Sequence, residues 1–136
     1  RACKSFLQKK GKLIVLLGAE GGGRDKAKRP VMGRIAAQLA DFVVVSNVDP
    51  YTDDPTEIIN NIADVAVQTG MRDGVNLFRI LDRREGIRHT LILAKQRDIV
   101  LITGKGAEQS MQIDGRSLPW DDRVVVREEL AKLKPR

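Results

Sequence analysis

The densest group of chemically useful side chains lies in a glycine-rich stretch near the start of the chain, GAEGGGRDKAKRP, at residues 18–30. The stretch follows an apolar run and precedes a helical pattern whose first turn is set by Pro30. Its side-chain charge therefore adds to the positive end of a helix dipole, which predicts an anion-binding loop. The alternative is a plain turn, in which the glycines only permit φ > 0 and the cations are solvated. The cations are Arg24, Lys26, Lys28 and Arg29.

The two standard nucleotide loops do not fit this stretch. Gly18 and Gly23 have the separation found in G-x-x-x-x-G-K-[ST], but Arg24 and Asp25 stand where the lysine and the hydroxyl belong. The hydroxyl normally ligates Mg²⁺ while backbone N–H groups wrap the phosphates, and a carboxylate in its place repels them. The dinucleotide pattern G-x-G-x-x-G cannot be threaded through these glycines either. Both loops are excluded.

Composition limits the class of protein. The chain has 136 residues with 42% hydrophobic content, which predicts one core and a single domain over residues 1–136. One cysteine, Cys3, allows no internal disulfide, and no stretch resembles a secretion signal or a membrane span. We therefore expect a reducing, cytoplasmic setting and no membrane partner. The chain opens at Arg1, as a piece excised from a longer protein would.

Charge alone would suit nucleic acid, since the net charge is +6. Basic residues are interleaved with acids, however, and aromatic residues make up only 4% of the chain. A stacking platform for single strands is therefore not expected, and a polyanionic small substrate fits the charge as well. We expect no nucleic-acid partner. With one histidine and one cysteine, we also expect no protein metal site. The histidine, His89, is expected at a surface or boundary position of a helix.

Apolar runs define the elements that must position the loop. KLIVLLG and DFVVVSN are typical of buried strands, and the segment between them has helical spacing. Further strands are expected in NLFRIL and DIVLITG, and a hairpin around Asp114 and Gly115. The pattern predicts an α/β, three-layer, Rossmann-like domain with a mainly parallel sheet. The apolar helical faces are expected at Met32, Ile35, Ala36 and Leu39; at Ile58, Ile62, Val65 and Ala66; at Ile87, Leu91 and Ala94; and at Val126, Leu130 and Leu133.

Polar residues mark helix starts and surfaces. Asp54 or Thr56 is expected to cap a helix over about residues 56–67, and Asp82 the next one. Asp25 and Arg29 are expected to pair within their loop. Trp120 is expected to pack at the rim of the core. A solvated face is expected for the arginine cluster Arg79, Arg83, Arg84 and Arg88.

Ligands of open α/β sheets gather beyond the carboxyl ends of the strands. Three loops are predicted there, and they carry recognisable motifs: GGRDKAKRPVMG at 22–33, VDPYTDDP at 48–55 and GKGAE at 104–108, followed by DDR at 121–123. In this order the motifs resemble the C-terminal domain of the Mur ligase family, over about residues 10–133. The similarity is to the branch that adds the third amino acid to UDP-N-acetylmuramoyl-L-alanyl-D-glutamate.

The resemblance implies a three-domain ligase of peptidoglycan precursor synthesis, of which this domain alone is inactive. Its partners would be the UDP-N-acetylmuramoyl dipeptide, an amino acid, ATP and the other two domains. ATP and Mg²⁺ would be held mainly by the absent central domain. ATP phosphorylates a carboxylate, an amine attacks the acyl phosphate, and phosphate leaves, so negative charge accumulates. Arg24 and Lys28 would neutralise it as catalytic residues, and Arg24 could also bind the amino acid's carboxylate.

The resemblance also implies substrate-binding residues. Gly104 and Glu108 belong to the GKGAE motif, and Glu108 would bind the distal ammonium of the amino acid. Asp49 and Tyr51 occupy the asparagine and arginine positions of the family's DNPR motif, and Ala107 replaces its histidine. A tyrosine lacks the fork that binds a distal carboxylate, so L-lysine becomes more plausible beside meso-diaminopimelate. For Asp49, an Asx-type turn is the alternative.

Two other functions stay open at this point. The chain could belong to a related Mur-type ligase, such as one for cyanophycin, folylpolyglutamate or a pseudomurein peptide. It could also be a free-standing module that binds anions or nucleotides through residues 18–29, because a fold does not fix a function.

Overall fold

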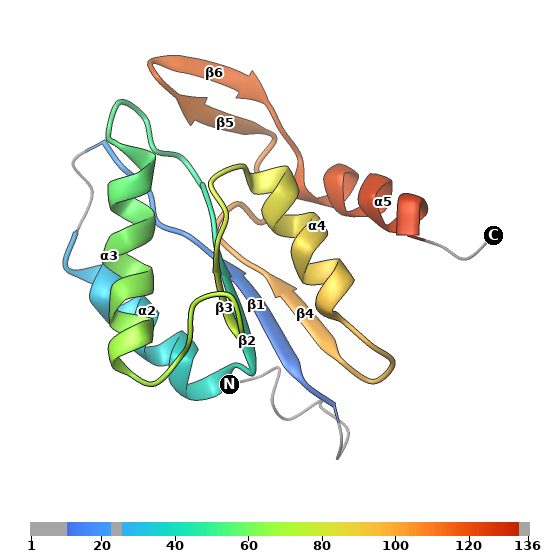
Figure 1. The fold of residues 1–136 in the computed structure, drawn as a ribbon. Coiled ribbons are helices and arrows are strands. Elements are labelled where there is room, and N and C mark those ends of the chain that lie inside the picture. The colour runs from blue at the N-terminus through green and yellow to red at the C-terminus, as the bar shows by residue number, and fades with distance from the viewer. Residues whose placement is uncertain (1–10, 23–25, 134–136) are drawn as a thin grey trace.

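The computed structural model describes residues 11–22 and 26–133. A parallel sheet lies between two layers of helices, and a separate hairpin stands beyond one end of the sheet (Figure 1). The predicted alternation of strands and helices and the three layers are confirmed. In chain order the elements are β1 (Leu13–Leu17), α2 (Lys28–Leu39), β2 (Phe42–Val45), α3 (Pro55–Gln68), β3 (Leu77–Arg79), α4 (Arg83–Leu93), β4 (Ile99–Ile102), β5 (Ser110–Ile113), β6 (Arg116–Pro119) and α5 (Asp122–Leu133).

The main sheet has the strand order β3-β2-β1-β4, and all its pairs are parallel. β1 lies between β2 and β4, with Leu17 opposite Val45 and Leu16 opposite Ile102. Because the strands are parallel, their carboxyl ends meet at one edge, and the three motif loops leave the sheet there. The hairpin of β5 and β6 is antiparallel and turns at Asp114 and Gly115, which have φ values of 49° and 73°. The predicted hairpin is confirmed.

Both faces of the sheet are covered, which explains why its strands are continuous apolar runs. One face packs against α2 and α3 through a core of Leu17, Val43, Val45, Ile59, Ile62, Ala63, Ala66, Met71 and Leu77. The other face packs against α4 and α5 through Leu16, Val44, Ile87 and Val125. Within the described residues, no helix is long and apolar enough to span a membrane.

Two helices start where their capping residues predicted. The Asp54 carboxylate accepts a hydrogen bond from Thr56 N at 2.9 Å, and that of Asp82 accepts one from Glu85 N at 3.0 Å. Each bond satisfies a backbone donor that the first turn of a helix leaves unpaired. Asp54, rather than Thr56, is therefore the cap of α3.

The predicted apolar face of α5 is confirmed for Val126, which packs against the core, but is wrong for Leu130 and Leu133. Leu130 and Leu133 are 44% and 38% exposed, whereas Val125 and Glu129 are buried. The helix packs mainly on α4, so only a narrow stripe is covered, and the glutamate in that stripe pairs with Arg84. Ile35 of α2 is likewise 47% exposed.

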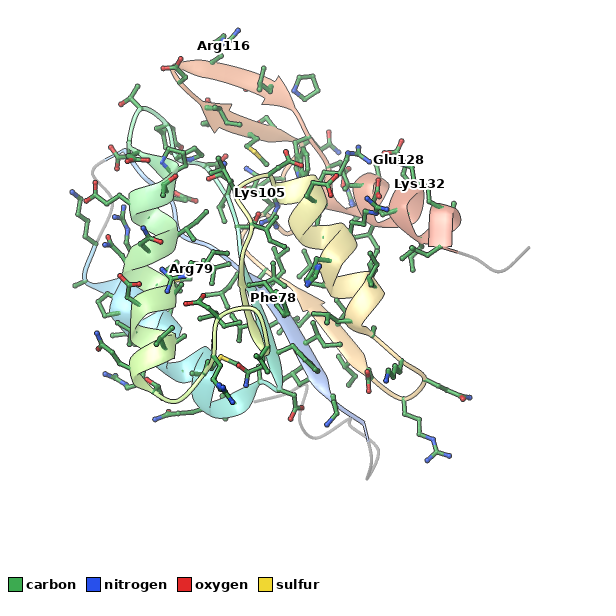
Figure 2. The ribbon with its side chains drawn as sticks, viewed as in Figure 1. Phe78, Arg79, Lys105, Arg116, Glu128 and Lys132 are labelled. Atoms are coloured by element: carbon green, nitrogen blue, oxygen red, sulfur yellow. The ribbon has the colours of Figure 1, made fainter. Side chains whose placement is uncertain are left out.

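The predicted solvated face of arginines is also wrong for Arg83, which is 1% exposed. Its two charged oxygen partners are supplied by Asp122, a residue 39 positions away in the sequence. Arg79 pairs with Asp64 and Asp73 at 2.7 and 3.0 Å, on the outer side of β3 (Figure 2). Helical spacing did not reveal these partners, because they come from distant elements.

The protonation of His89 should lower the stability of the fold. This half-buried residue of α4 is the only histidine, and its ring lies 4.3 Å from that of Phe78. Its Nε2 has no hydrogen-bond partner in the described part of the chain. Burial lowers the pKa of His89 from its ordinary value of 6.5, so the unfolded state binds this proton more readily. The neutral histidine therefore contributes stability above pH 6.5, and this contribution is lost as the pH falls through the lowered pKa of His89 in the folded state.

We expect the free energy of unfolding in urea to decrease between about pH 7.5 and 5.5, where carboxylates scarcely titrate. The His89→Gln variant should show little of this decrease. An equal decrease in the variant would assign the pH dependence to other groups.

Candidate functional site

The three motif loops enclose a cleft of about 510 Å³ at the carboxyl edge of the sheet. Lys28, the first residue of α2, stands on one side of it and Glu20 on the loop before α2. The lining of the cleft thus contains a cation, a carboxylate and two glycines, which expose only backbone. Its full lining is Gly18, Ala19, Glu20, Lys28, Met32, Val48 and Gly104.

Glycine is required at two points of this lining because the loops approach closely. A Cβ atom on Gly18 would lie 2.3 Å from the carbonyl oxygen of Ser46. At Gly104, a Cβ atom would lie 2.7 Å from a methyl carbon of Val48, and the backbone has φ +106°. Gly104, predicted as a binding residue, therefore forms a wall of the cleft through its backbone.

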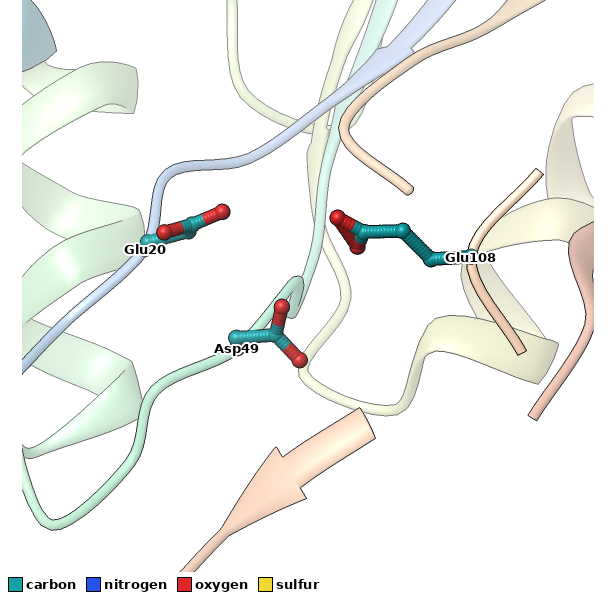
Figure 3. A group of neighbouring side chains, drawn as sticks. All are labelled: Glu20, Asp49 and Glu108. Carbon is teal, nitrogen blue, oxygen red and sulfur yellow. The ribbon is translucent and has the colours of Figure 1, made fainter. Parts of the chain in front are cut away.

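Three carboxylates from three loops face one another at the same edge (Figure 3). One oxygen each of Glu20, Asp49 and Glu108 lies within 4.8 Å of the others. Sequence analysis singled out Asp49 and Glu108 but missed Glu20. Glu20 lies in the glycine-rich stretch, where the neighbouring cations drew attention to anion binding instead. Only the parallel order of β2, β1 and β4 brings the three loops together.

The ammonium of Lys105 already lies in this acidic group. Its Nζ donates to both oxygens of Asp49 at 2.9 and 2.8 Å and lies 3.0 Å from Glu108 Oε2. Burial lowers the pKa of Lys105, but the hydrogen bonds to Asp49 and Glu108 outweigh it, so the pKa is raised above 10.5. The lysine is therefore charged at neutral pH. These residues do not fit a Mg²⁺ site, since two of the three carboxylates are already neutralised by the ammonium of Lys105.

Asp49 is buried, and its contacts are internal. Besides binding Lys105, its carboxylate accepts a hydrogen bond from Gln112 N of β5 at 2.8 Å. These partners lie outside its own loop, which differs from the side-chain bonding of an Asx-type turn. Its predicted contact with a substrate, like that of Tyr51, stays a prediction. Glu108 is more exposed than Asp49, although its Oε2 is paired with Lys105.

The cations of the glycine-rich stretch fall into different classes. Arg24 and Asp25 lie outside the described residues. The predicted roles of Arg24, and the pairing of Asp25 with Arg29, therefore remain predictions. Cys3 also lies outside the described residues. Lys28 is exposed and lines the cleft, as an anion-binding residue must. Arg29 is buried instead and donates to Asn61 Oδ1 of α3 at 2.9 Å. Arg29 therefore fastens α2 to α3.

Arg83 holds the loops that carry the acidic group. Its guanidinium donates to Asn47 O after β2 at 3.0 Å and to Thr103 O after β4 at 2.8 Å. Its other two bonds, at 2.9 and 2.7 Å, go to the carboxylate of Asp122 at the start of α5. Trp120, which packs at the rim of the core as predicted, donates from Nε1 to the same carboxylate at 2.6 Å. The DDR motif thus acts through its second aspartate as a structural anchor.

This arrangement is chemically suited to a zwitterionic ligand with an extra amine. Carboxylates from the loops present acceptors for ammonium groups, and Lys28 at a helix start presents a donor for an anion. The cleft is also lined by Gly18 and Gly104, which have no side chains. No described side chain is placed as a nucleophile with an adjacent base, so the chemistry that the cleft supports is binding and charge stabilisation.

The chain is similar to known ligases over most of its length. Residues 1–106 match the family described as Mur ligase, glutamate ligase domain. The UDP-N-acetylmuramoyl-L-alanyl-D-glutamate–2,6-diaminopimelate ligase of Syntrophomonas wolfei is 44% identical over 124 residues, which cover 89% of this chain and 24% of that ligase. Ligases of the same name from Nitrosomonas europaea and Bacteroides thetaiotaomicron are each 39% identical, and the aligned segments cover 98% and 93% of this chain and 24% and 26% of those ligases.

A solved structure of a ligase with that name superposes on the chain with a TM-score of 0.77 at 33% identity. The superposition covers 93% of this chain and 24% of that structure. The chain therefore spans about a quarter of the length of the relatives that it matches. The fold class and the resemblance that the four motifs indicated are confirmed.

Truncating Asp122 should destabilise the fold strongly, because it leaves the buried guanidinium of Arg83 without its counter-charge. Removal of one partner of a buried pair typically costs about 3–5 kcal/mol, so we expect Asp122→Ala to lower the free energy of unfolding in urea by about that amount. Asp121→Ala is the matched control: Asp121 pairs at the surface with Arg123 and accepts a hydrogen bond from Arg123 N in the first turn of α5, so its loss should cost only about 1 kcal/mol. Equal effects of the two substitutions would contradict the anchoring role of Arg83.

Proposed function

We propose, because the chain belongs to the Mur ligase family, that it is the amino-acid-binding C-terminal domain of an ATP-dependent ligase. The full-length ligase would join a diamino acid to UDP-N-acetylmuramoyl-L-alanyl-D-glutamate in the cytoplasm. The observation that carries this proposal is the cleft that the three family motifs build together, with Lys28 and Glu20 in its lining and Glu108 beside it. The names of the relatives support the same reaction class.

The proposed chemistry needs positive charge on this side of the cleft. ATP converts the free carboxylate of the muramoyl dipeptide into an acyl phosphate with loss of ADP. The amine of the incoming amino acid then attacks the carbonyl carbon, and the tetrahedral intermediate expels inorganic phosphate. Negative charge builds up on the phosphate and on the carbonyl oxygen. Lys28, together with Arg24, would stabilise that charge electrostatically without transferring a proton.

The remaining residues would select the amino acid. Glu108 is open to solvent and would accept a hydrogen bond from the distal ammonium of the substrate. Gly104 would form a wall of the cleft through its backbone, and Asp49 and Tyr51 would fix the loop beside it. The α-carboxylate would lie toward Lys28. A diamino acid matches this distribution, because it carries an ammonium at each end.

ATP and Mg²⁺ belong in this proposal to the central domain of the full-length ligase. The glycine-rich stretch lacks the hydroxyl and lysine pattern of a phosphate loop, and Lys105 already neutralises two of the three carboxylates. The domain alone is therefore expected to be inactive. Its contribution to the reaction would come on closure of the domains over the substrates.

The amino acid can be identified by inorganic phosphate release from the full-length ligase with UDP-N-acetylmuramoyl-L-alanyl-D-glutamate and ATP. We expect release with L-lysine or meso-diaminopimelate, and none above background with L-norleucine, which has the carbon chain of lysine but no distal amine. L-Ornithine tests the length of the chain. Equal release with norleucine would contradict recognition of the distal amine, and no release with any diamino acid would contradict the proposed function.

Removal of the Lys28 charge should slow the same reaction. A charge-assisted hydrogen bond is worth about 1.5–3 kcal/mol, so Lys28→Gln should reduce kcat/KM by roughly 10- to 150-fold. A lower kcat would indicate stabilisation of the phosphate, and a higher KM for the amino acid would indicate binding of its carboxylate. Lys26→Gln is the control, since Lys26 is equally exposed but does not line the cleft. Equal effects of both substitutions would contradict a specific role of Lys28 and would assign the effect to the summed positive charge of the loop.

A further inference from the structure

Tyr51 has a backbone conformation that an L-residue rarely adopts. Its φ is +56°, in the left-handed region, where a non-glycine residue is strained. Such a conformation persists only when the surrounding contacts fix it. The contacts around Tyr51 therefore show what this position does.

The hairpin fixes the backbone of Tyr51 from one side. Tyr51 N donates to Gln112 O at 3.0 Å, and Asp114 N donates to Tyr51 O at 2.7 Å. Tyr51 thereby forms an isolated parallel bridge with Ile113 of β5. The Asp49 carboxylate, bonded to Gln112 N, adds a further link between the same loop and the hairpin. Both polar groups of the Tyr51 backbone are thus bonded to the hairpin.

The ring of Tyr51 lies against the glycine-rich stretch on the other side. A Cβ atom on Gly22 would lie 3.1 Å from both Cγ and Cδ2 of Tyr51. The neighbouring Gly21 donates from its N to Asp49 O at 2.8 Å, and a Cβ atom there would lie 2.2 Å from Pro50 O. Glycine at both positions lets the two loops lie in direct contact. Tyr51 therefore stands between the hairpin and the stretch that leads to Lys28.

We propose that Tyr51 is a positioning residue: the hairpin fixes its backbone, and its ring fixes Gly22, two residues beyond Glu20 in the lining of the cleft. The ring, not the phenol hydroxyl, performs this role. Substrate contacts are then left to the charged groups that border the cleft, Glu20, Lys28 and Glu108. The kinetic part of this inference rests on the proposed function.

Hydrogen exchange of the full-length ligase tests the positioning role without any activity. In Tyr51→Ala, exchange of the amides of residues 18–22 should accelerate roughly tenfold, because the loop loses the ring that covers it. Tyr51→Phe, which retains the ring, should exchange like the wild type. The amides of α4 should keep their rates in both variants, which separates local loosening from general destabilisation. Unchanged exchange at residues 18–22 in Tyr51→Ala would overturn the inference.

Kinetics separate positioning from direct contact with the substrate. Tyr51→Phe should retain kcat and the KM for the amino acid within about twofold, whereas Tyr51→Ala should lower kcat more than it raises that KM. A large increase in KM in Tyr51→Phe would show direct contact of the phenol with the substrate and overturn the inference. Absence of turnover in the wild type would instead contradict the proposed function, and hydrogen exchange would still decide the role of Tyr51.

Discussion

The buried guanidinium of Arg83 is the interaction on which the carboxyl edge of the sheet depends. It binds the loop after β2 at Asn47, the loop after β4 at Thr103, and the start of α5 at Asp122. Parallel strands bring these loops to one edge, but hydrogen bonds within the sheet do not set the distance between the loops. A buried charge must satisfy its donors, so the loops and the helix have to meet at the guanidinium. The bonds of Arg83 to these loops therefore set the distance between the loops that line the cleft.

A second buried pair acts closer to the cleft. Lys105 and Asp49 join the loops after β4 and β2, and Asp49 also holds Gln112 of the hairpin. Burying two charges is favourable only when hydrogen bonds satisfy them, as they do here. Asp49 is thus fixed as part of the frame, while Lys28 and Glu108 at the border of the cleft stay exposed to solvent. A rigid frame with a few accessible charges is the arrangement that a domain closing over substrates requires.

The fold was largely predictable because its signals are local. Continuous apolar runs marked the parallel strands, Asp54 and Asp82 marked helix starts, and Asp114 with Gly115 marked the hairpin. The errors came from distant partners. Arg83 has the sequence environment of a surface arginine, and only the arrival of Asp122 from α5 makes it a buried one. The positions of Glu20 and Lys105 beside Asp49 were not predicted either, because the order of the strands decides which loops meet.

The central claim is that the cleft between the glycine-rich stretch and the GKGAE loop binds the incoming amino acid. A crystal structure of the full-length ligase with ADP, the muramoyl dipeptide and the amino acid that supports turnover would test it most directly. We predict density for the amino acid between Lys28 and Glu108, with its α-carboxylate toward the lysine and its distal ammonium toward the glutamate. Density for the amino acid outside this cleft, with Lys28 and Glu108 in contact with solvent alone, would contradict the claim.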